Sequence, residues 1–258
     1  MLTSPQKHFF FVQLPVFVTA IAAAIFSPAS VFSLTNLGII FLLYCLIFGF
    51  AIEVGFHRYF SHRAFELRFE WMKYLITYLG LFAMSHAPFS WILVHRQHHK
   101  YSDTKGDIHS PVNGGFWFSF IGWNNKVKDT DITIRKNELV RDKFQVWLHR
   151  NYLPFMVTNL VTLLALFPHF TAFTLFPASL LAYISVGLGA ALSHTPGIGY
   201  KNFELGDNSN NLLLFGIWSF GLGYQNNHHK YPGAETVKVK WYEFDPGYYI
   251  VKLIKKGQ

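Results

Sequence analysis

Four long apolar runs dominate the pattern of hydrophobic and polar positions along the chain. They cover residues 9–26, 34–56, 152–167 and 173–192. At about 1.5 Å of rise per residue, about 18 to 20 apolar residues form a helix that crosses the roughly 30 Å hydrocarbon core of a bilayer. Short uncharged loops join the first two runs and the last two. The pattern therefore predicts an all-α integral membrane protein with four transmembrane helices in two hairpins.

The polar remainder of the chain is expected to form one cap on a single membrane face. This cap would comprise residues 57–151 and 193–258, and the whole chain, 1–258, would be one domain. A further apolar stretch at 71–87 contains Lys73, and we interpret it as a buried or interfacial helix rather than a fifth span. The first run could instead be a cleaved signal peptide, but its length and the three spans that follow favour an uncleaved helix.

The distribution of charge predicts the orientation in the membrane. Only 14% of the residues are charged and 51% are hydrophobic, which is typical of a membrane protein. All 22 lysines and arginines lie outside the loops 27–33 and 168–172, so the positive-inside rule puts both termini and the cap in the cytoplasm. The net charge of +8 suits anionic lipid. Because the basic residues form no compact stripe interleaved with aromatics, we expect no nucleic acid partner.

Histidines form three tight clusters, all at the predicted cytoplasmic face. There are 13 histidines, and the clusters are "HRYFSH", "HRQHH" and "QNNHH". Residues at i, i+3 and i+4 share one face of a helix, whereas residues five apart diverge by about 140° unless the helix ends or distorts. Another histidine follows the last apolar run. The candidate metal ligands are His57, His62, His95, His98, His99, His194, His228 and His229, with Gln225 three residues before the last pair.

Eight imidazoles exceed what one ion can hold, and they suit two ions. Cys45 is the only cysteine, which excludes an intrachain disulfide, an iron–sulfur cluster and zinc sites of the cysteine type. Zinc would bind the same nitrogens, but iron also fits the oxygen chemistry that an unactivated methylene requires. We therefore predict two iron ions beside an apolar substrate. His109, in "DTKGDIH", is a candidate to support a ligand from behind.

These motifs resemble those of the membrane fatty acyl desaturases, the family of stearoyl-CoA and cyanobacterial acyl-lipid desaturases. The resemblance covers residues 50–250 and includes "GFHRYFSHRAF", "HRQHHKYSDTKGDIHSPVNGGFWFSFIGW", "GLGYQNNHHKYP" and "WYEFDPGYYI". It implies a four-span bundle whose cytosolic cap holds two irons. One iron would be bound by His57, His62, His95, His99 and His229, and the other by His98, His194, His228 and Gln225. The residues implied to orient imidazoles are Asp207, Asn208, Asn211 and Asn226.

The sequence departs from the animal members of the family at several positions. Gln225 and Ala190 stand where those members have histidine and asparagine. Leu93 and Val94 replace a charged pair near the CoA headgroup, which favours an acyl-lipid over an acyl-CoA substrate. The departure at Gln225 leaves the position of the double bond open.

The resemblance also implies a closed tunnel for the acyl tail, whose depth is set by the second span. Cys45 and Gly49 are four residues apart, so they share one helix face, and both are small. They would leave room for a long chain. Alternatively, Gly49 only permits close helix packing, as small residues do in membranes.

The function predicted from the sequence is oxygen-dependent desaturation that introduces a cis double bond into a long-chain acyl group. The chain contains no dinucleotide fingerprint and no haem attachment motif, so electrons would come from an external donor such as a ferredoxin or a cytochrome. A hydroxylase or ketolase could use the same histidine site. A protein that binds lipid without catalysis is the alternative from another class.

Overall fold

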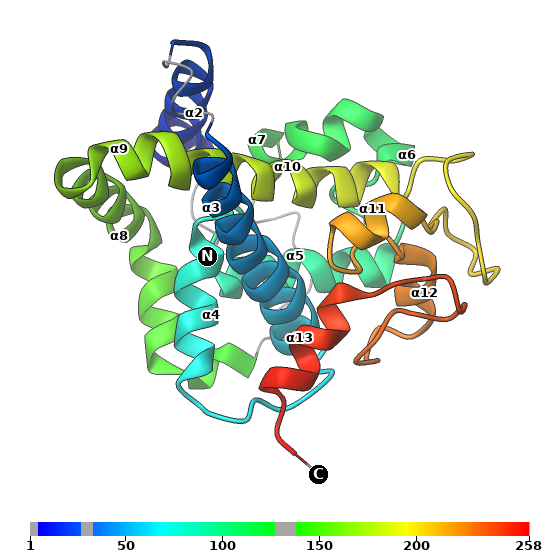
Figure 1. Cartoon of the computed structure of the whole chain (residues 1–258). Coiled ribbons are helices and arrows are strands. Elements are labelled where there is room, and N and C mark those ends of the chain that lie inside the picture. The colour runs from blue at the N-terminus through cyan, green and yellow to red at the C-terminus, as the bar shows by residue number, and fades with distance from the viewer. Residues whose placement is uncertain (1–4, 27–32, 127–137, 258) are drawn as a thin grey trace.

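The computed structural model describes residues 5–26, 33–126 and 138–257 (Figure 1). Most of the loop predicted between the first two spans, residues 27–32, lies outside the described residues, as does the part 127–137 of the predicted cap. The described part of the chain consists of helices and loops, with isolated β-bridges and no strand. The all-α prediction is confirmed for these residues.

Within the described residues, three continuous helical stretches are long and apolar enough to cross a membrane. They are Gln6–Phe26, Leu34–Ser61 and Pro168–Leu192. Many large apolar side chains on them are exposed, including Phe26 at 83% and Leu34 at 89%, as expected for surfaces that face lipid. Their elements are α1 (Pro5–His8), η1 (Phe9–Gln13), α2 (Leu14–Phe26), α3 (Leu34–Tyr44), η3 (Cys45–Ser61), α9 (Pro168–Phe170), η7 (Thr171–Leu175) and α10 (Phe176–Leu192).

The third predicted span, residues 152–167, falls on a kinked helix. Helix α8 (Lys143–Leu166) begins at Asp142, whose side chain accepts hydrogen bonds from two backbone amides of the first turn. Its backbone leaves helical geometry at Asn151, three residues before Pro154. Proline inside a helix removes one backbone hydrogen bond and kinks the helix, which accounts for the distortion. The polar residues around this kink interrupt the apolar run, so the structure confirms three of the four predicted spans.

The remaining helices are short and lie in the segments predicted to form the cap. Helix α4 packs on η3. Helix α13 begins at Asp245, whose side chain accepts a hydrogen bond from the amide of Tyr248. The cap elements are α4 (Met72–Leu81), α5 (Pro88–Tyr101), α6 (Pro111–Gly114), η4 (Phe118–Gly122), α7 (Trp123–Lys126), η6 (Glu138–Arg141), α11 (Leu213–Trp218), α12 (Gln225–Lys230) and α13 (Pro246–Ile254).

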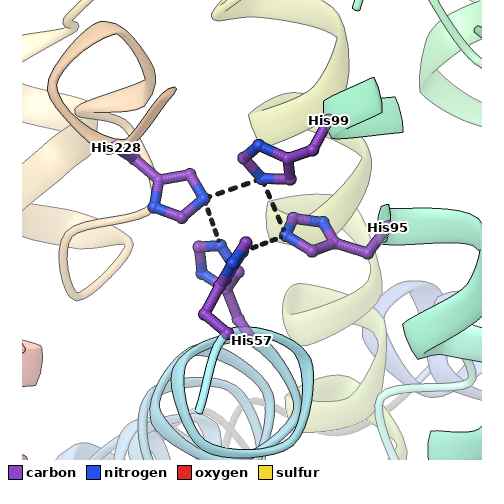
Figure 2. Close-up of side chains that lie close together, drawn as sticks. His57, His95, His99 and His228 are labelled. Atoms are coloured by element: carbon purple, nitrogen blue, oxygen red, sulfur yellow. Dashed lines mark hydrogen bonds between the residues drawn. The ribbon is translucent and has the colours of Figure 1, made fainter. Parts of the chain in front are cut away.

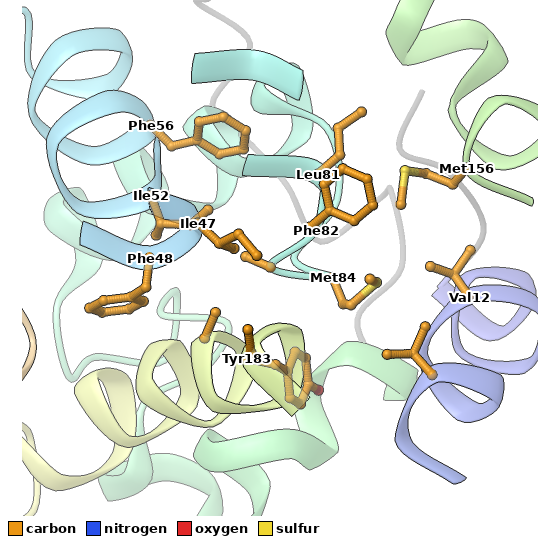
Figure 3. Close-up of a cluster of buried hydrophobic side chains, with 14 of the residues drawn as sticks. Val12, Ile47, Phe48, Ile52, Phe56, Leu81, Phe82, Met84, Met156 and Tyr183 are labelled. Atoms are coloured by element: carbon orange, nitrogen blue, oxygen red, sulfur yellow. The ribbon is translucent and has the colours of Figure 1, made fainter. Parts of the chain in front are cut away.

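The main hydrophobic core lies where the spans meet α4 and α8 (Figure 3). Ile52 and Phe56 of η3, Met84 after α4, Met156 of α8 and Val12 of η1 are all buried there. Between membrane-spanning helices such contacts are stabilised by van der Waals packing rather than by removal from water, because lipid tails are also apolar. This packing holds the C-terminal end of η3, and with it the first histidine cluster, at a defined position against the cap.

Candidate metal centre

The first histidine cluster lies at the end of η3, where the backbone bonds widen to residues five apart. The amide of His62 donates to the carbonyl of His57 over 3.2 Å. Such π-type turns bring residues i and i+5 to the same side of a helix, and they are frequent at functional sites. The two rings, which would diverge on a regular α-helix, therefore have centroids 5.0 Å apart. The distortion expected between these histidines is confirmed.

The second cluster lies on one face of α5, which begins with Pro88. The Nε2 atoms of His95 and His99, one turn apart, are separated by 3.1 Å. His98 lies on the same helix but turns toward other partners, since its ring centroid is 4.7 Å from that of His194 and 5.1 Å from that of His229. One helix thus supplies imidazoles to two neighbouring groups.

Five imidazoles converge in what we call the first histidine group (Figure 2). The Nε2 atoms of His57 and His228 are 2.9 Å apart, and those of His62 and His95 are 2.7 Å apart. Two nitrogens bound at right angles to one ion at about 2.1 Å would lie about 3 Å apart, so these separations fit ligands of a single metal. The ligand atoms lie within 4.8 Å of one another in the group His57, His62, His95, His99 and His228.

A second histidine group comprises His98, His194 and His229, and each of its rings is backed by a carboxylate. Nδ1 of His98 donates to Asp107 over 2.8 Å. Nδ1 of His194 donates to Asp103 over 3.0 Å, and Nδ1 of His229 donates to Asp207 over 2.8 Å. This bond fixes the tautomer in which Nε2 carries a lone pair. The Nε2 atoms of His194 and His229 are buried and have no hydrogen-bond partner, as ligand atoms for a metal would be.

Burial favours the neutral, metal-binding form of five of these imidazoles. Desolvation, reinforced by neighbouring histidines, lowers the pKa of His62, His95, His99 and His228 well below 6.5. Burial likewise lowers the pKa of His229 to about 3, although Asp207 opposes the shift.

The carboxylates behind the second group stay ionised. Burial raises the pKa of Asp107, Asp103 and Asp207, but their hydrogen bonds from the histidine rings and neighbouring groups outweigh it and hold each pKa below its usual range. Imidazoles that donate to ionised carboxylates in this way are suited to a divalent metal.

The third cluster divides between the two groups in the opposite way to the one that the resemblance implies. His228 joins the first group and His229 joins the second, so that assignment was wrong. Adjacent side chains on α12 diverge by about 100°, and each therefore faces a different group. Gln225, at the start of α12, is buried and lines a cavity beside His98 and His194, but its role as a ligand stays a prediction.

Three carboxylates that contact imidazoles were missed from the sequence, namely Glu53, Asp103 and Asp107. Glu53 accepts the Nδ1 proton of His57 over 2.7 Å. Its position four residues before His57 is the signal that could have found it. Asp103 and Asp107 belong to the loop after α5, close in sequence to the histidines of that helix.

Of the residues expected to orient imidazoles, Asp207 contacts one directly, because its carboxylate accepts a hydrogen bond from Nδ1 of His229. Asn208 contributes its backbone amide, which donates to Asp103 over 2.7 Å. The Asn211 and Asn226 side chains hydrogen-bond to neighbouring residues of the cap. Asn211 binds Asn227, and Asn226 binds the backbone at 202–203 and Ser209.

His109 is buried and stacks on the ring of His98 at 4.5 Å between centroids. Its Nδ1 lies 3.9 Å from Asp107. It can therefore support His98 from behind, as the sequence predicted, but by ring contact.

An apolar cavity adjoins both histidine groups. Ser85, His86, Asn124 and Tyr183 supply polar groups to its wall. His86, which had no partner at ligand spacing in the sequence, reaches this cavity from a turn in which both it and Met84 have positive φ. The wall also includes Ile52, Trp91, Val94, His95, His98, His109, Phe120, Trp123, Val186, Gly187, Ala190, His194, Leu222 and Gln225.

Cys45 and Gly49 are not among the residues that line this cavity. A Cβ built on Gly49 would lie only 2.8 Å from ring atoms of Phe220. That close approach favours the alternative in which Gly49 serves helix packing. The predicted contribution of both residues to a tunnel is not supported by the cavity described here.

Comparison with known proteins points to one family. A family model described as fatty acid desaturase matches residues 9–253. The sn-1 stearoyl-lipid 9-desaturase of Synechocystis sp. is 32% identical over 241 residues, which cover 86% of this chain and 70% of that protein. The sn-2 palmitoyl-lipid 9-desaturase of Nostoc sp. is 32% identical and covers 91% of this chain and 83% of its own. The acyl-CoA C20 Delta5-desaturase of Anemone leveillei is 30% identical, with 90% and 74% covered.

Proposed function

Since the chain belongs to the fatty acid desaturase family, we propose that its two histidine groups hold two iron ions that serve the desaturation of a long-chain acyl group. The chain is an oxidoreductase that introduces double bonds into acyl substrates. The observation that carries the metal proposal is the convergence of eight imidazoles in two adjacent groups beside an apolar cavity. Iron bound there would supply the oxygen chemistry needed to remove hydrogen from an unactivated methylene.

The protein's own residues would bind the two metal ions and enclose the acyl chain. The first group would bind one ion through His57, His62, His95, His99 and His228, and the second group would bind the other through His98, His194 and His229. Gln225 is proposed as a further ligand of the second ion, because it is buried and shares the cavity wall with His98 and His194. The apolar wall of the cavity would receive the acyl chain and exclude water from the reacting carbon.

The proposed substrate is an acyl-lipid rather than an acyl-CoA. Leu93 and Val94 are apolar where a charged pair would approach the CoA headgroup. Leu93 packs in a small buried cluster with Ile108, and Val94 lines the cavity, so neither offers charge to a phosphate. Two of the relatives named above are acyl-lipid desaturases, which supports the same choice.

The proposed topology has four spans and both termini in the cytoplasm. The apolar part of α8 after Pro154 would pair with the helical stretch Pro168–Leu192 to form the second hairpin. The absence of lysine and arginine from 27–33 and 168–172 supports this orientation. Reduction of oxygen to two waters takes two electrons more than the substrate provides. A separate carrier, such as a ferredoxin or a cytochrome, would supply them at the basic cytosolic face.

The test is expression of the chain in a host with a simple fatty-acid profile, followed by mass spectrometry that locates new double bonds. We expect a monounsaturated product in the lipid fraction and about two irons per purified chain. An added oxygen in place of a double bond would contradict desaturation. A double bond formed by protein that binds no iron would contradict the metal assignment.

A further inference from the structure

Two buried carboxylates near the C-terminus connect the helices that carry His57 and His228. Glu243 and Asp245 are 0% and 2% exposed, and neither belongs to the two histidine groups. A buried carboxylate is unfavourable unless it is paired and fully hydrogen-bonded. Their partners show what the two side chains hold in place.

Asp245 is linked to His57 through two further charged side chains. Its two oxygens accept from Nη2 and Nη1 of Arg58, both over 2.9 Å, in the bidentate geometry typical of a strong arginine–carboxylate pair. Arg58 also donates from Nε and Nη2 to Oε1 of Glu53, both over 3.0 Å. The other oxygen of Glu53 accepts the proton of His57 Nδ1 over 2.7 Å. Asp245 is thus joined to a candidate metal ligand by an unbroken chain of buried hydrogen bonds.

The backbone around the guanidinium of Arg58 is shaped to accommodate it. A Cβ on Gly221, whose φ of +108° favours glycine, would overlap Nη2 of Arg58. A Cβ on Gly247 would also crowd the guanidinium, at 2.9 Å. The carbonyls of Phe220 and Glu235 accept its remaining bonds, each over 2.9 Å. The chain leaves space for this one group and satisfies it on every side.

Glu243 is hydrogen-bonded to α12, the helix that carries His228. Its Oε2 accepts from Nδ2 of Asn227 over 2.9 Å, and Asn227 directly precedes His228 on α12. Oε2 also accepts the amides of Val239 and Lys240 over 2.7 and 2.8 Å. Oε1 accepts from Tyr200 and Asn202, both over 2.8 Å. The orientation of α12 therefore depends on a carboxylate that lies two residues from Asp245.

We propose that Glu243 and Asp245 form a positioning clasp that holds His57 and His228 at the 2.9 Å separation of their Nε2 atoms. The proposal rests on the metal centre proposed above. A productive ligand set has to be held within about 0.5 Å, and partners behind the ligands usually provide this. Because both carboxylates lie on one short segment, that segment fixes two ligands that come from distant parts of the chain.

The test is a titration of metal-free purified protein with Co²⁺, in which binding is monitored through the visible absorption of the bound ion. We expect the wild type to bind two ions. In Asp245→Asn, affinity for one ion should fall about 10–100-fold, while the other ion binds as in the wild type. Adding His194→Ala should then remove the remaining tight ion and so assign it to the second group. The matched control is Glu235→Gln on the same segment, since its carboxylate pairs with Lys255 rather than with the clasp.

The outcomes separate the clasp from the metal centre itself. A wild type that does not bind two ions would contradict the metal centre. Unchanged affinity for both ions in folded Asp245→Asn would overturn the clasp. If that variant does not fold, Glu243→Gln gives the same test from the other side, with loss of affinity at the first group as the supporting result. Failure of both variants to fold would show that the carboxylates serve the fold alone, and would also overturn the clasp.

Discussion

The Nε2 atoms of His57 and His228 lie 2.9 Å apart, although 171 residues separate the two histidines in the sequence. His57 belongs to the long apolar helix that ends at Ser61, and His228 to the short helix α12 of the cap. Neither ring can donate a proton to every neighbouring Nε2 atom of the group, because a neutral imidazole carries one N–H. A shared metal ion, as proposed above, would resolve this arrangement, and the predictions below follow from that proposal.

Replacement of His228 should remove the first metal. We expect His228→Ala to lower desaturation at least 100-fold and to reduce bound iron from about two to about one per chain, because one of five ligands is lost and a cavity replaces it. The protein should still insert into the membrane. The matched control is His169→Ala, since His169 is exposed on α9. Iron content and product formation, measured on the same preparations, decide; retained activity in His228→Ala would contradict the assignment.

Replacement of Asp207 should loosen the second metal without removing a ligand. In Asp207→Asn the amide accepts the Nδ1 proton of His229 less strongly, so the imidazole becomes a weaker donor to the metal. We expect affinity for one ion to fall about 10–100-fold, and this can be measured by competition with a chelator. Glu204→Gln, an exposed change three residues earlier, serves as the control and should bind both ions normally.

Substitutions of Gln225 should distinguish a ligand from a wall residue. An amide oxygen binds a metal more weakly than an imidazole does, so Gln225→His should keep iron. Gln225→Leu, which keeps the approximate volume but removes the oxygen, should lower iron content or rate. Iron analysis and product formation are the measurements. A fully active leucine variant with normal iron would show that this position is not a ligand.

Enlargement of Gly49 should damage packing rather than chain-length preference. Because its Cβ would already meet the Phe220 ring, Gly49→Phe should overpack the helix contact and destabilise the protein by about 1–3 kcal/mol or more. The yield of folded protein should fall, and the preference among acyl chain lengths should stay unchanged. Gly38→Phe is the matched control, since a Cβ at Gly38 meets nothing within 4 Å. A shift toward shorter chains at normal yield would restore the tunnel prediction.

Narrowing of the cavity should affect turnover but not metal. Val186 lines the cavity, so Val186→Phe should fill space next to the histidine groups and lower acyl turnover about tenfold or more. Iron content should stay at the wild-type level. Leu181→Phe on the same helix α10 is the control, because Leu181 is 36% exposed on the outer surface. Unchanged turnover in Val186→Phe would show that the acyl chain takes another path.

The sequence sufficed for features that depend on local periodicity. Apolar runs longer than a bilayer is thick predicted membrane helices, and three of them are confirmed. The i, i+3, i+4 spacing placed His95, His98 and His99 on one helix face, as the structure has them. The run at 152–167 is not among the candidate spans, and Asn151 and Pro154 interrupt the helix that contains it. Local pattern alone does not say how such a kinked helix meets the membrane.

Features that depend on long-range contacts needed the tertiary structure. The carboxylate behind each histidine of the second group comes from another element or loop. Asp103, for example, reaches His194 across 91 residues. No spacing rule connects such residues. The cavity wall likewise draws on segments from Ile52 to Gln225, and it bypasses Cys45 and Gly49 because Phe220 packs on the latter.

The sequence by itself therefore determined the class of protein and the histidine clusters that could bind a metal, since these follow from composition and periodicity. Only the tertiary structure decided which ion each ligand would serve. His228 and His229 are adjacent and diverge by about 100° on α12, so either could face either group. The rotation of α12 decides between them, and it depends on the bond from Asn227 to the buried carboxylate of Glu243.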